Sequence, residues 1–340
     1  MVDTTRLQGI ARRFADTAVL YTSIDLELFT KIDKGANTEA LLSAATGLTL
    51  RNVDRLVTCL LSLGLVEWED QAAGVLRNAP DVARYLVKGK RGYAAEWMTF
   101  MRHKVADWMD ITSILKRKEA PRKLGMYVEE LFTVEDAAKY HKATASIGFG
   151  SGAKFAREVD LSKRSHLLDL GGGSGGYSIQ AVKRYPGLRA TVLDLPQVIE
   201  GATKKYVAES GFADRVGVLP GDFTVTPFPS VDACVMASNL PQYSQELICL
   251  VVQRAHDCLE PGGEFHLVGE VLRDDRVGPI DAAMWGMEEL INGSDGRSHT
   301  ETDVVGYFKK AGFTSITITD FIPSTLRRVT GFKKGSRARL

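Results

Sequence analysis

The stretch LLDLGGGSGG at residues 167–176 constrains the fold of this chain more than any other. A short apolar run ends in Asp169 and passes directly into Gly171, Gly172 and Gly173, after which a helical pattern begins. Glycines let the backbone turn tightly and approach a bound ligand without Cβ clashes. The stretch therefore predicts a buried strand, a ligand-binding turn and a helix. A glycine-rich turn alone is weak evidence, because dinucleotide-binding folds begin in a similar way.

The rest of the chain indicates which domain contains this motif and which domains precede it. From about residue 165 onward, strand-like and helix-like segments alternate, which is typical of a Rossmann-like, doubly wound and mostly parallel α/β sheet. We expect seven strands in it. The first hundred residues instead predict three helices and a β-ribbon, a winged-helix arrangement. We therefore predict a mainly helical winged-helix-like dimerisation domain at 1–100, a helical linker with substrate-pocket helices at 101–160, and a ligand-binding Rossmann-like domain at 161–340.

A winged helix often binds DNA, but the charges argue against that function here. The predicted third helix, LRNVDRLVTCLLSLGL, carries only Arg51 and Arg55 as cations and is otherwise strongly apolar. The whole chain has 43 basic and 42 acidic residues, so its net charge of +1 does not recruit nucleic acid or an anionic membrane. We expect the apolar third helix to pack against another chain.

The location of the protein is predicted from what the sequence lacks. No apolar run approaches the roughly 18 residues that a membrane span requires, and the N-terminus has no signal-peptide pattern. The four cysteines form no CxxC pair, which favours free thiols in a reducing cytoplasm. No group of His, Cys and acidic residues has metal-ligand spacing, so we expect no metal.

The helices predicted between residues 91 and 160 carry a stripe of Trp, Phe and Met. Such a stripe belongs to a core more often than to a pocket. Several side chains are nevertheless candidates for a substrate pocket: His103, Trp108, His141 and Trp285.

Acidic residues end the next two predicted strands. Asp194, in VLDLP, is placed to accept hydrogen bonds from both hydroxyls of a ribose. Asp222 and Phe223, in LPGDF, suit an adenine. The carboxylate would accept a hydrogen bond from the adenine amino group, and the phenyl ring would cover the adenine ring. For Asp222 alone, a helix N-cap is the alternative. Asp222 is the third acid at a strand end, after Asp169 and Asp194, and its presence favours S-adenosylmethionine over a dinucleotide.

Together, DLGGGSGG, LDLP, GDF, LEPGG and AGF resemble the class I S-adenosylmethionine-dependent methyltransferases. More narrowly, the chain resembles the small-molecule O-methyltransferase family that includes plant caffeate and acetylserotonin enzymes and bacterial polyketide-tailoring enzymes. The resemblance covers nearly the whole chain and implies S-adenosylmethionine as cofactor and a homodimer with interlocked N-terminal domains. The cofactor-binding residues that we predict are Asp169, Gly171, Gly172, Gly173, Asp194, Leu195, Asp222, Phe223, Ser238 and Asn239.

The segment VMASNLPQYSQE at 235–246 departs from that family. Where the family has a His that deprotonates the acceptor hydroxyl, this chain has Pro241, which cannot accept a proton. The two acids that orient this His in the family are also absent: Gly269 and Ser298 take their positions, with Glu270 and His299 beside them.

The catalytic candidates are therefore different ones. Gln242 and Tyr243 are placed to orient an acceptor by hydrogen bonds. His299 is the nearest substitute base, with a solvated loop histidine as the alternative interpretation, and Glu270 is a further possible substitute.

The sequence leaves the reaction open between two main hypotheses. The first is methylation of a small aromatic or natural-product-like acceptor at carbon, nitrogen or an acidic oxygen, by positioning rather than by the family's base. The second is a homologue that keeps S-adenosylmethionine and uses its positive sulfur to assist a rearrangement, hydroxylation or decarboxylation. A winged-helix binding protein with a vestigial cofactor fold is disfavoured by the intact glycine turn, Asp194 and Asp222.

Overall fold

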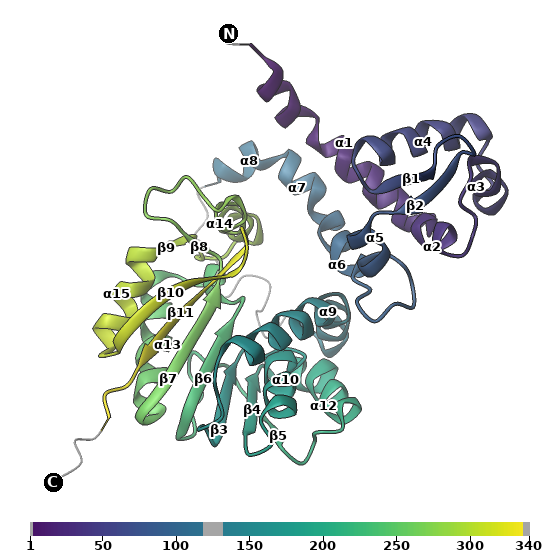
Figure 1. Cartoon of the computed structure of the whole chain (residues 1–340). Coiled ribbons are helices and arrows are strands. Elements are labelled where there is room, and N and C mark those ends of the chain that lie inside the picture. Colours follow the sequence, from purple (N-terminus) through teal and green to yellow (C-terminus); the bar gives the residue numbers. More distant parts are fainter. Residues whose placement is uncertain (1–2, 118–131, 336–340) are drawn as a thin grey trace. The chain divides into compact units, whose positions relative to one another are not determined.

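The computed structural model describes residues 3–117 and 132–335. The chain divides into two compact units, Met1–Arg102 and His103–Leu340, shown from purple to yellow in Figure 1. The predicted linker at 101–160 falls almost entirely within the second unit, and its residues 118–131 lie outside the described part. Among the described helices, none has both the length and the apolar character that crossing a membrane requires.

The first unit consists of helices and one small antiparallel ribbon. Its elements are α1 (Thr5–Asp25), α2 (Leu28–Asp33), α3 (Glu39–Thr46), α4 (Leu50–Ser62), β1 (Val66–Asp70), β2 (Val75–Asn78), α5 (Pro80–Tyr85) and α6 (Ala95–Phe100). Thr38 and Thr49 cap α3 and α4, since each side chain accepts a hydrogen bond from the backbone N–H three residues later.

The apolar face of α4 is used inside this unit. Val53, Val57 and Leu60 are fully buried in the unit's own core. Our prediction that this face packs against another chain is therefore wrong for these residues. The third helix is apolar because it is the central helix of a small domain, which must bury one face of each helix to form a core.

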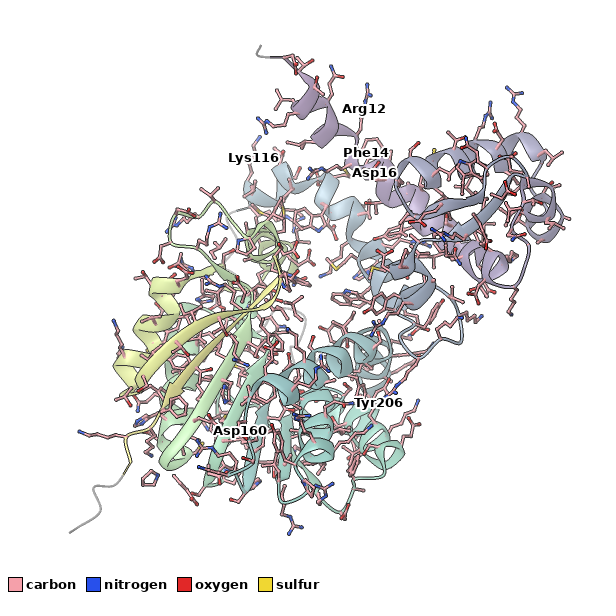
Figure 2. All side chains as sticks on the ribbon, in the orientation of Figure 1. Arg12, Phe14, Asp16, Lys116, Asp160 and Tyr206 are labelled. Atoms are coloured by element: carbon pink, nitrogen blue, oxygen red, sulfur yellow. The ribbon has the colours of Figure 1, made fainter. Side chains whose placement is uncertain are left out.

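A group of exposed apolar side chains lies on α1. Leu7, Ile10 and Phe14 are 56%, 50% and 64% exposed, and their spacing of three and four residues places them on one helical face. Figure 2 labels Phe14 on this helix, with Arg12 and Asp16 close to it in sequence. Helices α1 and α2 are separate, because the backbone turns at Glu27, whose φ is 50°.

The second unit is built on the predicted seven-stranded α/β sheet. Its strands are β3 (His166–Leu170), β4 (Arg189–Asp194), β5 (Val216–Pro220), β6 (Val231–Ala237), β7 (Leu259–Gly269), β10 (Thr314–Ile322) and β11 (Leu326–Phe332). Their order is β10-β11-β7-β6-β3-β4-β5, parallel from β7 to β5, with β11 antiparallel to both β7 and β10. Chain order reverses at β3, between β4 and β6, which is where such sheets bind ligands.

Helices cover both faces of this sheet (Figure 1). Buried side chains of α13 (Gln245–Cys258) and α15 (Glu301–Ala311) form one core with the sheet. Those of α9 (Val134–Glu158), α10 (Gly176–Arg184) and α12 (Lys204–Ser210) form the other. The doubly wound architecture predicted from the alternating pattern is confirmed.

Helices α9 and α10 approach each other closely at glycines. A Cβ on Gly152 of α9 would lie 2.5 Å from the carbonyl oxygen of Gly176, at the start of α10. A Cβ on Gly176 would lie 2.7 Å from the carbonyl carbon of Gly148. Neither position has room for a side chain, so the contact is one of backbone on backbone.

Two parts of the unit differ from the sequence patterns. The long helix that the aromatic and Met stripe predicts is divided: η1 (Met101–Lys104), α7 (Val105–Met109) and α8 (Ile111–Leu115) follow α6 as separate turns. Met109 is 73% exposed, so part of this stripe belongs to no core. Helix α14 (Ile280–Asn292) and the short parallel pair β8 (Val271–Leu272) and β9 (His299–Thr300) were not predicted.

Candidate functional site

The glycine turn after β3 is closed over Asp169. Its Oδ2 accepts hydrogen bonds from the Ser178 hydroxyl at 2.8 Å and the Ser178 backbone N–H at 3.3 Å, while Oδ1 has no partner among the described residues. A Cβ on Gly172 would lie 2.7 Å from the Asp169 carboxyl carbon. Burial raises the pKa of Asp169 to about 6. The turn thus needs glycine at 172 because the carboxyl group lies directly against it.

Gly171 brings together the ends of three strands. Its φ is +63°, and a Cβ there would lie 2.7 Å from Nδ2 of Asn239 and 3.0 Å from Cε1 of Phe223. The Asn239 amide also donates to the carbonyl of Ala237 at 2.9 Å. The predicted cofactor residues after β3, β5 and β6 therefore lie together at one edge of the sheet.

Gly173 is held by side chains from two other elements. Its N–H donates to Oδ2 of Asp194 at 2.8 Å, and its carbonyl accepts from the Thr203 hydroxyl at 2.6 Å. Thr203 ends a π-helical turn, η3 (Ile199–Thr203), which follows α11 (Pro196–Val198). Such turns are frequent at functional sites. Sequence reasoning missed Thr203, because no local pattern marked a π-turn there.

Asp194, at the end of β4, also accepts from the backbone N–H of Leu195 at 2.7 Å. Burial raises the pKa of Asp194 to about 7, with Asp169 and Asp222 adding to the increase. Leu195 itself packs beside Phe132, Ala137 and Val198. Its predicted contribution to the site is therefore its backbone N–H and an apolar side chain.

One carboxylate oxygen of Asp222 stabilises the local turn, and the other is left without a hydrogen bond from the described residues. Its Oδ1 accepts from the Thr224 backbone N–H at 2.7 Å, as the alternative capping interpretation expects, and no described residue contacts its Oδ2. Phe223 is buried and its ring centroid lies 5.4 Å from that of Tyr243. Both interpretations of Asp222 are thus compatible with the same geometry.

The segment after β6 combines strain with burial. Ser238 is exposed and has a φ of 58°, which is rare for a residue other than glycine. Pro241 lies in the short helix η4 (Leu240–Gln242) and is buried. A Cβ on Gly296 would lie 2.2 Å from the Pro241 carbonyl oxygen, so the loop after α14 is packed directly on this segment.

Tyr243 and Gln242 remain free to bind a ligand. Tyr243 is 7% exposed, and its hydroxyl has no hydrogen-bond partner in the described chain. Burial raises the pKa of this hydroxyl, so it stays protonated. The Gln242 side chain is half-buried and is likewise without a described partner.

His299 is not a solvated loop residue. It is completely buried, its Nε2 lies 3.0 Å from the Tyr243 carbonyl oxygen and its Nδ1 lies 3.0 Å from the Tyr307 hydroxyl. A carbonyl can only accept, so Nε2 carries the hydrogen and Nδ1 accepts from Tyr307. Burial lowers the pKa of His299 to about 4. No lone pair of the ring is left for a substrate proton, and the alternative of a solvated loop histidine is wrong.

A buried ionic cluster lies on α14, which sequence reasoning did not anticipate. Lys104 forms an ion pair with Glu288 and contacts the Asn292 amide oxygen at 2.6 Å. Trp108 donates from its indole N–H to the other oxygen of Glu288 at 2.9 Å. The only sequence signal for α14 was the helical spacing of residues 280–292. No sequence signal predicted that this helix would pair with residues about 180 positions earlier.

Two further glutamates near this cluster are buried. Glu289 accepts from the Ser294 hydroxyl at 2.6 Å and from the Asn292 amide at 3.2 Å, and burial raises its pKa. Burial also raises the pKa of Glu270 to about 7, and its Oε2 has no partner among the described residues.

The predicted pocket residues do not form one group in the contacts that the structure gives. Trp108 belongs to the ionic cluster, His141 lies against the glycine turn, His103 is exposed and Trp285 is half-buried on α14. Within residues 3–117 and 132–335, no three His, Cys, Asp or Glu side chains gather in an arrangement that would hold a metal ion.

The geometry fits a nucleoside with a charged tail. The edge offers acceptors at Asp194 and Asp222, an aromatic face at Phe223, and an unpartnered buried oxygen on Asp169. The turn at Gly171 is too close to its neighbours for any side chain, so only backbone can face a ligand there.

Comparison with known proteins identifies related chains. The family model described as "O-methyltransferase domain" matches residues 125–314. The tetracenomycin polyketide synthesis 8-O-methyl transferase of Streptomyces glaucescens is 26% identical over 309 residues, which cover 90% of each chain. The 3-hydroxy-5-methyl-1-naphthoate 3-O-methyltransferase of Streptomyces sahachiroi is 27% identical over 316 residues, covering 92% of this chain and 90% of the relative.

Solved structures show the same fold over nearly the whole chain. Human N-acetylserotonin methyltransferase in complex with S-adenosylmethionine superposes with a TM-score of 0.81 at 21% identity, covering 98% of this chain and 99% of that one. A putative O-methyltransferase from Nostoc punctiforme superposes with a TM-score of 0.84 at 17% identity, covering 98% and 100%.

Proposed function

From the premise that the chain belongs to the S-adenosylmethionine-dependent O-methyltransferase family, we propose a specific reaction for it. It methylates a small aromatic or natural-product-like acceptor at carbon, nitrogen or an acidic oxygen, and it does so by positioning the acceptor. One observation carries this proposal. Asp194 and Asp222 lie at the carboxyl ends of neighbouring strands, while the resemblance assigns buried Pro241 the position of the family's base.

The residues that would hold the cofactor follow from the edge. Asp194 accepts from the ribose hydroxyls, Asp222 from the adenine amino group, and Phe223 covers the adenine ring. The turn at 171–173 faces the amino-acid end. When bound there, S-adenosylmethionine supplies a methyl group on a positively charged sulfur.

The protein's own contribution is orientation. Gln242 and Tyr243 would hold the nucleophilic atom of the acceptor in line with the methyl group and the sulfur that bound S-adenosylmethionine would supply, and the acceptor's proton would leave to water. Alignment of the two reactants can supply most of the rate of such a displacement. A general base adds about 10²–10⁴-fold, which an already nucleophilic acceptor does not need.

Tyr243 and Gln242 are the residues that orient the acceptor. Tyr243 is 7% exposed, and its hydroxyl has no hydrogen-bond partner among the described residues, so it is available to bond to a ligand. His299 supports this role, since its Nε2–H donates to the Tyr243 carbonyl. We therefore assign His299 as a positioning residue for Tyr243 in place of the base that the sequence suggested.

Following the methyl group tests this function. The protein is incubated with S-adenosylmethionine labelled in the methyl group and a panel of hydroxynaphthoates, acidic phenols and ring-nitrogen heterocycles, and products are identified by mass spectrometry. Labelled product that disappears in Asp194→Ala supports the proposal. An acceptor that is converted without gaining the label would instead establish a non-methylating reaction.

We also propose that the protein acts as a homodimer through its first unit. The exposed face of α1, formed by Leu7, Ile10 and Phe14, is the surface that supports this. Obligate dimers bury about 2,000 Å² or more, so light scattering at micromolar concentration should give twice the chain mass. Phe14→Asp should shift the protein toward monomer, whereas Val225→Asp, at an exposed apolar residue of the second unit, should not.

A further inference from the structure

We propose that His141 binds the amino-acid end of S-adenosylmethionine, donating a ring N–H to its α-carboxylate. The inference rests on the proposed function, because it requires the cofactor to lie along the glycine turn. It assigns a role to a residue that the sequence marked only as a candidate for the substrate pocket.

The position of His141 is fixed by the glycine turn. A Cβ on Gly173 would lie 2.6 Å from Cε1 and 3.0 Å from Nδ1 of the His141 ring. Gly173 has a φ of +56°, and both of its backbone polar groups are already bonded, to Asp194 and Thr203. The ring therefore packs against a fixed turn, and the backbone N–H and carbonyl of Gly173 are already hydrogen-bonded to other residues.

The ring of His141 lacks hydrogen bonds. It is 8% exposed, and neither ring nitrogen has a hydrogen-bond partner among the described residues. Its backbone carbonyl accepts weakly from Tyr206, whose position on α12 is labelled in Figure 2. The ring nitrogens of His141 are not among the buried side-chain atoms without a hydrogen bond, so they are accessible, and a donor held against a ligand-binding turn is available to a ligand.

Charge decides which group of the ligand His141 binds. The amino-acid end carries a carboxylate and an ammonium. Asp169 lies directly under Gly172 with an unpartnered oxygen, so it attracts the ammonium and repels the carboxylate. His141, against the next glycine, is then left for the carboxylate. A neutral imidazole can donate one ring N–H to a carboxylate.

The experiment uses ligands that differ only at this end. Calorimetry measures the binding of S-adenosylhomocysteine, of decarboxylated S-adenosylmethionine, which lacks the carboxylate, and of 5′-methylthioadenosine, which lacks the whole amino acid. The variants are His141→Leu, which keeps volume, and His141→Gln, which keeps a donor. His166→Gln is the control, because His166 starts β3 at the opposite end of the same strand.

We expect His141→Leu to weaken S-adenosylhomocysteine about ten- to a hundredfold, the usual effect of a hydrogen bond to a charged group. Binding of the two ligands without a carboxylate should change less than about twofold, which also shows that the variant is folded. His141→Gln should recover part of the loss, and His166→Gln should behave as the wild type.

Other outcomes are decisive in different ways. An equal loss for all three ligands, or no loss for S-adenosylhomocysteine, would overturn the role of His141. If the wild-type protein binds neither S-adenosylhomocysteine nor S-adenosylmethionine, the proposed function fails instead.

Discussion

The loop after β3 and the segment after β6 lie at the same edge of the sheet but are held by partners at different distances along the chain. The loop is fixed by side chains of the two elements that follow it, with Gly173 bonded to Asp194 and Thr203, 21 and 30 residues away. The segment at 239–243 is fixed by residues distant in sequence, with His299 on the Tyr243 carbonyl and the loop after α14 against Pro241.

Because of this difference, we expect the two regions to tolerate amino-acid substitutions to different degrees. A loop that binds through its backbone tolerates little substitution, so the nucleoside end of the site keeps its form. A segment held by residues distant in sequence, such as His299, can change when those residues change.

The largest effect is expected at the ionic cluster on α14. Lys104→Met leaves Glu288 buried without its cation, which should lower the free energy of unfolding by about 3–5 kcal/mol in urea titrations. The double variant Lys104→Met, Glu288→Leu should recover most of this loss, because no unpaired charge remains. The affinity for S-adenosylhomocysteine should stay unchanged; a parallel loss of binding would mean that the two regions are not independent.

The glycine loop should show the reverse pattern. Gly173→Ala places a Cβ against His141 in a left-handed conformation, and we expect binding of S-adenosylhomocysteine to weaken on the order of a hundredfold, since the loop must move. Gly211→Ala is the matched control, because Gly211 also has a positive φ but nothing within 4 Å. Both should destabilise the fold by roughly 1–2 kcal/mol. Equal binding in the two variants would refute the contact with His141.

Tyr243→Phe tests the acceptor side directly. Removing a hydroxyl that orients the acceptor should lower kcat by up to roughly tenfold, and more if a buried group of the acceptor is left unpaired. Turnover with the best acceptor of the panel measures this. Cofactor affinity should not change, and a loss of affinity in place of kcat would assign Tyr243 to the cofactor edge.

The pH dependence should come from the cofactor edge. With a pKa of about 7, Asp194 is partly protonated at neutral pH in the free protein, whereas its ordinary value is about 4. Hydrogen bonds from a ribose favour the ionised form, so binding should release protons and become tighter as pH rises through 7. Calorimetry of S-adenosylhomocysteine in buffers of different ionisation enthalpy measures this release, which should be absent in Asp194→Asn.

The same pKa fixes the sign of the stability change. Between about pH 4 and 7 the folded protein holds a proton that the unfolded chain has already lost. The contribution of Asp194 to the free energy of unfolding should therefore fall as pH rises through this range, and it is measured as the difference between the ligand-free wild type and Asp194→Asn. A difference that grows with pH over this range would contradict the raised pKa.

The smallest effect is expected where the family has its base. Pro241→His should not raise turnover, because an acceptor that is already nucleophilic has no difficult proton to lose. The fixed φ of proline also helps to set the positions of Gln242 and Tyr243, so a small decrease is compatible with the proposal. Marked acceleration would show that proton removal limits the reaction.

The fold and the cofactor edge could be predicted because their signals are local. Glycines at 171–173 and acids at the ends of β4 and β5 each act within a few residues of the strand that positions them. The doubly wound sheet then brings these strand ends together in any chain with this pattern. Parallel strands leave little freedom in where their carboxyl ends meet.

The acceptor side could not be predicted for the opposite reason. The partners of Glu288 and of the Tyr243 carbonyl lie 184 and 56 residues away along the chain, and nothing in the local pattern marks them. The environment of His299 was likewise hidden, because burial depends on α15 and the segment at 239–243 packing around it. The face of α4 was misread since an apolar helix buries its side chains equally well in its own domain or in another.

The glycine contact between α9 and α10 limits how this protein can evolve. Gly148, Gly152 and Gly176 bring the two backbones together, so a first substitution at Gly152 or Gly176 would separate the helices before any second change could compensate. Elements without such a backbone contact, such as α14 and η4, are therefore the places where single substitutions can change the acceptor side most easily.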